Sequence, residues 1–126
     1  MAKSLRAKHP EEHLHILVAK RNSGSFTYDG IELGGERVCQ EIEEECEKME
    51  REGKAIKRFS LVGYSLGGLV ARYTAGLLES KGFFEKVKPV TFTTFATPHL
   101  GVRTPLRGWH NHMYVQLGSG CIGKVC

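Results

Sequence analysis

The sequence has no hydrophobic run long enough to cross a bilayer. Its longest apolar stretch, Ile16 to Ala19, is the size of a strand, whereas a membrane-spanning helix needs about 20 apolar residues. No segment resembles the apolar core of a secretory signal peptide. The 126 residues fit one small domain. We therefore expect a single intracellular domain.

The spacing of the cysteines matches neither a disulfide framework nor a metal site. Cys39 and Cys46 are seven residues apart in a helix-like segment, Cys121 and Cys126 lie near the end of the chain, and no CxxC pair is present. A chain without signs of secretion usually keeps its thiols reduced. We expect four free thiols, no metal site and no cofactor.

Acidic residues are absent after Glu85, and Asp29 is the only aspartate. Nine of the 14 acids fall between Glu32 and Glu52, so residues 86–126 carry only Lys and Arg as formal charges. A basic segment of this kind can contact phosphate or anionic lipid headgroups. A solvated surface of a larger protein is the simpler interpretation, and we expect no nucleic-acid partner.

What is present is an alternation of strands and helices. Short β-branched apolar runs predict buried strands at Leu14–Ala19, Arg58–Gly63 and Pro89–Phe95. Apolar residues at helical spacing predict helices from Gly35 to Glu52 and from Leu66 to about Lys81. The residues before the first strand are expected to end a further helix.

Strands that alternate with helices indicate an α/β fold built from parallel β-α-β units with right-handed crossovers. The sequence of residues 100–126 predicts only loop with some helix. Parallel sheets are normally covered on both faces, which about three strands cannot achieve. We therefore expect an incomplete three-layer fold, with about three parallel strands and flanking helices, in a chain that begins within the fold.

The motif that carries chemistry is Gly63-x-Ser65-x-Gly67, which lies between a predicted strand and a predicted helix. This is the context of a nucleophile elbow, a sharp turn that holds a serine hydroxyl above the sheet. Side chains at Gly63 or Gly67 would collide with the neighbouring strand or helix, and Gly68 permits still closer packing. The backbone N–H of Leu66, at the start of the helix, is the predicted oxyanion donor.

The motif alone is a modest signal. With this many glycines and serines, a shuffled sequence would contain it in roughly one case in ten. The alternative is that the motif has only a structural role, as a glycine-rich turn that happens to contain a serine. The strand before the motif and the helix after it favour Ser65 as a catalytic nucleophile.

The longer pattern resembles a eukaryotic family of serine esterases and lipases first defined as a domain of unknown function, whose fungal members include lipid-droplet phospholipases. The resemblance rests on the segments Gly63–Tyr73, Phe95–Gly101, Thr27–Ile31, Gly34–Arg37, Arg103–Leu106 and Trp109. It implies a partial α/β-hydrolase domain over 1–114 that hydrolyses acyl esters, with lipid or phospholipid as substrate, followed by a divergent tail over 115–126. It also makes His99 and Tyr64 residues that position or adjoin the site.

Three parts of a working site are not recognisable. The family's second oxyanion donor usually comes from a His-Gly pair, which this sequence lacks. The triad acid should follow the serine, but Glu79 and Glu85 are expected at the wrong edge of the sheet. His99, just past the end of the third strand, is a candidate base by its place, whereas the resemblance gives it a positioning role. His110 and His112, in a polar loop, are weaker candidates. The chain alone should therefore have little activity.

Two alternatives stay open. A non-catalytic relative that binds lipid or a protein partner has the basic segment in its favour, together with the aromatic residues Phe83, Phe84, Phe92 and Trp109. A thioesterase or an acyltransferase would use the same turn, because acyl-transfer enzymes share it. The resemblance also implies a protein that is cytoplasmic or peripheral on a membrane or lipid droplet.

Overall fold

The structure is a computed structural model that describes residues 2–9, 14–23, 29–101 and, for the backbone only, 119–125. Four helices and four strands occur in this part of the chain, in the order α1 Ala2–Lys8, β1 His15–Val18, α2 Ile31–Arg51, β2 Arg58–Ser65, α3 Leu66–Ser80, α4 Phe83–Lys86, β3 Lys88–Phe95 and β4 Ser119–Val125. The three predicted strands, the two predicted helices and the helix expected before the first strand are therefore present. None of the described helices has the length and apolar character of a membrane span.

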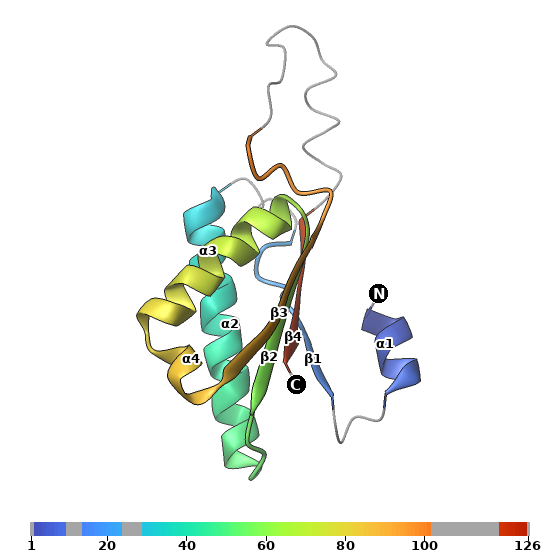
Figure 1. Cartoon of the computed structure of the whole chain (residues 1–126), viewed down its shortest axis with the longest axis vertical. Coiled ribbons are helices and arrows are strands. Elements are labelled where there is room, and N and C mark those ends of the chain that lie inside the picture. The colour runs from blue at the N-terminus through green and yellow to red at the C-terminus, as the bar shows by residue number, and fades with distance from the viewer. Residues whose placement is uncertain (1, 10–13, 24–28, 102–118, 126) are drawn as a thin grey trace, which may run out of the picture.

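The strands form one mixed sheet in the order β1-β4-β2-β3 (Figure 1). β2 and β3 are parallel, whereas β4 runs antiparallel to both β1 and β2. Two antiparallel steps leave β1 pointing in the same direction as β2, so the three predicted strands do share a direction. This agrees with the expectation of about three parallel strands, whereas the insertion of β4 between β1 and β2 was not expected.

Within residues 100–126, for which loop with some helix was expected, residues 119–125 instead form the strand β4, and residues 102–118 lie outside the described part of the chain. The sequence of β4 contains Gly120 and Gly123 and lacks the alternation that marks a strand. β4 is instead defined by its pairing with two strands, since Ile122 lies opposite Val18 on β1 and opposite Val62 on β2. A strand that is hydrogen-bonded to a neighbour on both sides can form even where its own sequence has little β propensity.

Helices α2, α3 and α4 lie on one side of the sheet and α1 lies on the other (Figure 1). The guanidinium of Arg6 on α1 donates a hydrogen bond of 3.1 Å to the carbonyl of Ile16 on β1. α2 begins at Ile31, four residues earlier than predicted, and ends in a turn where Gly53 has a φ of +76°. The N–H groups of Gly53 and Lys54 donate to the last carbonyls of the helix, as in a Schellman motif.

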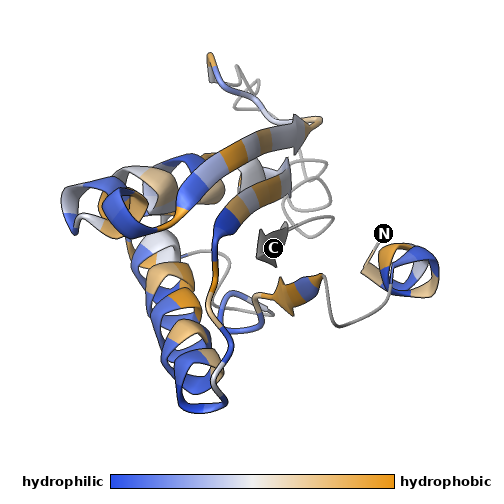
Figure 2. Ribbon diagram, turned by 60° about the horizontal axis from the view of Figure 1, so that its bottom comes forward, coloured by the Kyte–Doolittle hydropathy of each residue, from blue (hydrophilic) through white to orange (hydrophobic). Residues whose placement is uncertain are grey.

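The core lies between the sheet and helices α2 and α3. Its buried members are Val38, Cys39, Ile42, Phe59, Leu61, Val70, Ala71, Leu78 and Val87. Figure 2 shows hydrophobic segments in the strands, whereas much of α2 is hydrophilic where it faces away from them. The predicted apolar stripe of α2 is therefore its buried face.

α2 and α3 approach each other closely through glycine. A Cβ on Gly35 would lie 2.5 Å from Cδ1 of Tyr73, so no larger residue fits without displacing that ring. The buried hydroxyl of Thr74 lies 3.2 Å from the Gly35 carbonyl and 2.9 Å from that of Val70. This contact fixes α3, and with it the turn from which α3 starts.

β3 ends the sheet within the described part of the chain, and Val90, Phe92 and Phe95 on it are about half exposed. Phe83 and Phe84, by contrast, pack with Phe59 at ring-centroid distances of 5.4 and 5.9 Å. These two partly buried aromatic side chains pack against the core, which weakens their support for a lipid-binding surface.

Candidate active site

Ser65 is the last residue of β2, and α3 starts at Leu66. Its backbone has φ 53° and ψ −130°, a conformation that costs a non-glycine residue on the order of 1–3 kcal/mol. A serine at the N-cap of a helix usually accepts a hydrogen bond from one of the first helical N–H groups through its hydroxyl. Ser65 makes no such capping bond. The Ser65 hydroxyl is therefore not used to satisfy an N–H group at the start of α3.

The glycines around Ser65 allow the strand and the helix to meet. A Cβ on Gly63 would lie 2.5 Å from the Cα of Gly68 and 2.8 Å from the carbonyl oxygen of Gly67. Both Gly67 and Gly68 are buried in the first turn of α3. Hence the predicted collision at Gly63 occurs against the helix backbone, where no flexible side chain can yield.

Leu66 occupies the first helical position. The first four N–H groups of a helix lack partners within it, and the helix dipole makes this end partly positive. The N–H of Leu66 thus belongs to a group of donors suited to a developing negative charge. It adjoins the Ser65 hydroxyl in sequence, which is the arrangement the oxyanion prediction requires.

Thr97 closes the Ser65 turn from the side of β3. Its hydroxyl donates a hydrogen bond of 2.9 Å to the Ser65 carbonyl, across 32 positions in sequence. A Cβ on Gly68 would overlap this hydroxyl and would lie 2.6 Å from the Thr97 methyl carbon. Thr97 was not identified from the sequence, although the motif Thr97-Pro98-His99 was part of the resemblance.

His99 has both ring nitrogens engaged. Nε2 lies 2.9 Å from the Thr94 hydroxyl, and Nδ1 lies 3.5 Å from the guanidinium of Arg72. A guanidinium can only donate, so Nδ1 is the acceptor and Nε2 carries the proton that Thr94 accepts. An imidazole held in this way is suited to positioning the loop after β3. Neither Arg72 nor Thr94 was identified from the sequence.

Tyr64 lies opposite Phe95 in the parallel β2–β3 ladder. The two side chains are 49% and 45% exposed and, because paired residues share a face, they stand together on one side of the sheet. Gly63, one residue earlier, faces the other side, toward α3. Tyr64 is therefore next to Ser65 in the chain but on the face away from the helices.

The candidate acids lie elsewhere. Glu79 is on α3, 14 residues beyond Ser65 and so about 20 Å along the helix. Glu85 lies on α4, beside the start of β3. Asp29 precedes the serine and forms an ion pair of 2.5 Å with Arg37. His110 and His112 fall outside the described residues.

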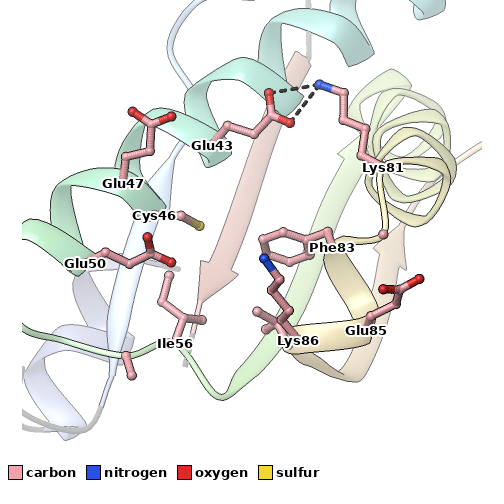
Figure 3. Close-up of a pocket in the computed structure, with 12 residues that line it drawn as sticks. Glu43, Cys46, Glu47, Glu50, Ile56, Lys81, Phe83, Glu85 and Lys86 are labelled. Carbon is pink, nitrogen blue, oxygen red and sulfur yellow. Dashed lines mark hydrogen bonds and ion pairs between the residues drawn. The ribbon is translucent and has the colours of Figure 1, made fainter.

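A pocket of about 740 Å³ opens at the other end of the molecule, between the C-terminal half of α2 and the α3–α4 turn (Figure 3). Cys46 and Ile56 contribute to its wall, and Lys81 forms an ion pair of 2.7 Å with Glu43 at its margin. Ile56 precedes β2, whereas Ser65 ends it, and eight strand residues span about 25 Å. This pocket is thus separate from Ser65.

The fold and the Ser65 turn define the class: an α/β protein with a strained serine between a parallel strand and a helix. The family described as "Putative serine esterase (DUF676)" matches residues 1–125. The chain belongs to this family. No solved structure gives a significant match.

The curated relatives are yeast proteins named as lipases. "Putative lipase ROG1" of Saccharomyces cerevisiae is 30% identical over 121 residues, which cover 93% of this chain and 16% of that protein. "Putative lipase C4A8.10" of Schizosaccharomyces pombe is 44% identical over 70 residues, covering 52% of this chain and 8% of that protein. The chain therefore spans less than a fifth of the length of these relatives. The resemblance to an esterase and lipase family is confirmed.

Proposed function

We propose that Ser65 is the nucleophile of a serine esterase or lipase with an α/β-hydrolase fold. One observation carries the proposal: Ser65 keeps a strained backbone at the carboxyl end of a parallel strand, yet its side chain does not cap the helix that follows. Strain of this kind persists where function requires it. The family and the names of the relatives supply the chemistry, which is ester hydrolysis.

In this reaction the Ser65 hydroxyl oxygen forms a bond to the ester carbonyl carbon, and its proton passes to a general base. The tetrahedral oxyanion accepts a hydrogen bond from the Leu66 N–H. The alcohol then leaves with a proton, and water hydrolyses the acyl-enzyme to release the acid. Among the described residues none is hydrogen-bonded to the Ser65 hydroxyl, so we assign no general base among them.

A lipid ester is the substrate class that the relatives' names suggest. The same turn would serve a thioester equally well, because both reactions pass through an acyl-serine. Paired assays with a p-nitrophenyl ester and an acyl thioester of the same chain length would separate the two. Contact with a membrane or lipid droplet stays a prediction, and flotation with anionic vesicles at low salt tests it.

The test of Ser65 is labelling of the chain with a fluorophosphonate probe, which reacts with activated serines. We expect slow labelling, because no base is in place, and its complete loss in Ser65→Ala. Ser80→Ala is the matched control, since Ser80 is exposed at the far end of α3 and should leave labelling unchanged. Labelling that persists in Ser65→Ala, or a parent chain that is never labelled at Ser65, would contradict the proposal.

A further inference from the structure

The peptide group that joins Ser65 to Leu66 is held by a residue outside the Ser65 turn. The Thr97 hydroxyl lies 2.9 Å from the Ser65 carbonyl oxygen and 3.4 Å from that of Phe95, so its single proton is better placed for Ser65. A trans peptide group is planar, and its C=O and N–H point in opposite directions. A bond that fixes the Ser65 carbonyl therefore also fixes the direction of the Leu66 N–H.

Thr97 has little freedom to move. It is packed on the first turn of α3 so closely that a Cβ on Gly68 would overlap its hydroxyl. The carbonyl of Thr97 also accepts a hydrogen bond of 3.0 Å from the N–H of His99. His99 is in turn held between Thr94 and Arg72 by its two ring nitrogens. The loop after β3 is thus fastened to both the strand and the helix.

Strained backbone conformations occur on both sides of the Thr97–Ser65 hydrogen bond. Within the described part of the chain, the non-glycine residues with positive φ are Ser65 at 53° and Ala96 at 51°. Ala96 directly precedes Thr97, so the Thr97–Ser65 hydrogen bond joins the two strained segments. Such conformations last only where surrounding contacts determine them fully.

We propose that Thr97 is a positioning residue that directs the Leu66 N–H toward the oxyanion, an inference that rests on the proposed role of Ser65. An oxyanion donor is effective because its direction is set before the charge develops. Without the Thr97 hydroxyl, the strained peptide can rotate and the N–H loses that alignment. Thr97 thus acts through the Ser65–Leu66 peptide group and takes no part in bond making or breaking.

The test compares Thr97→Val, which keeps the shape but removes the hydroxyl, with Thr97→Ser, which keeps the hydroxyl. We expect Thr97→Val to lower the rate of Ser65 labelling at saturating fluorophosphonate by about tenfold, as for the loss of one hydrogen bond. The probe concentration for half-maximal rate should not change, and Thr97→Ser should retain most of the rate. Thr91→Val, at an exposed position of β3, is the matched control and should label like the parent.

A second measurement does not depend on reactivity. NMR of a chain labelled with ¹³C at the Ser65 carbonyl and ¹⁵N at the Leu66 amide reports the peptide group directly. Both resonances should shift in Thr97→Val and stay near their parent positions in Thr97→Ser and Thr91→Val.

The outcomes are distinguishable. Resonances that do not move in Thr97→Val would overturn the proposal, since the hydrogen bond would then not hold the peptide group. Resonances that move while Thr97→Val labels as fast as the parent would also overturn it. A parent chain that is never labelled at Ser65 would overturn the proposed function itself.

Discussion

Gly63 and Gly68 meet backbone to backbone, so that a Cβ on Gly63 would lie 2.5 Å from the Cα of Gly68. This contact joins the end of β2 to the first turn of α3 without any side chain between them. It explains why the Ser65 turn can be so sharp. It also makes the two glycines a requirement of packing, separate from any role in catalysis.

Gly63→Ala should therefore destabilise the fold. The added methyl group meets backbone atoms that cannot rotate away, and overpacking of this kind costs about 2 kcal/mol. Urea unfolding followed by circular dichroism would measure the change in the free energy of unfolding. Gly76→Ala is the control on α3, because a Cβ there meets nothing within 4 Å. It should stabilise the chain by up to about 1 kcal/mol, and equal effects of the two substitutions would contradict the packing argument.

Gly34 and Gly35, neighbours on α2, differ in how closely they pack against their surroundings. A Cβ on Gly35 would lie 2.5 Å from a ring carbon of Tyr73, whereas one on Gly34 would lie 3.4 Å from its nearest neighbours. We expect Gly35→Ala to lower the free energy of unfolding by about 1–3 kcal/mol, which thermal unfolding would show as a lower midpoint. Gly34→Ala, its neighbour on the same helix, should cost less. A larger loss at Gly34 would show that the helices do not pack in this register.

The backbone of Ser65 predicts a conflict between stability and function. Glycine adopts positive φ at no steric cost, so Ser65→Gly should stabilise the chain by about 1 kcal/mol while it abolishes labelling. Ser65→Ala also removes the hydroxyl but keeps the strain, and its stability should stay within about 0.5 kcal/mol of the parent. Thermal unfolding of the three chains measures the difference. Equal stabilities of Ser65→Gly and Ser65→Ala would show that the backbone of Ser65 stores no strain.

The sequence predicted the parts of the fold that follow from local patterns. Spacing of Val38 and Ile42 located α2, and the glycines at 63 and 67 located the turn between β2 and α3. β4 could not be predicted, because a glycine-containing strand that pairs with β1 and β2 gives no local signal. Thr97 was missed for the same reason, since its contact with Ser65 spans 32 positions.

The thiol of Cys46 gives a prediction for the opposite end of the molecule. Burial, followed by the charges of Glu50, Glu45 and Glu43, raises its pKa from 9.0 to about 11. Since the thiolate is the reactive form, alkylation of the folded chain by iodoacetamide should be slow at pH 8. The thiolate fraction there is about a hundredfold smaller than for an unperturbed thiol. Peptide-resolved mass spectrometry would measure the rate at Cys46 separately from the other cysteines.

The pH dependence of this reaction checks the cause of the shift. The rate at Cys46 should rise about tenfold per pH unit until the pH approaches about 11, because only the thiolate reacts. Glu50→Gln removes the largest of the three charge contributions, so it should lower the pKa and speed alkylation at pH 8. Glu47→Gln is the matched control, as Glu47 lines the same pocket but is not among those contributors. A rate that levels off near pH 9 in the folded parent would show that Cys46 is not buried as described.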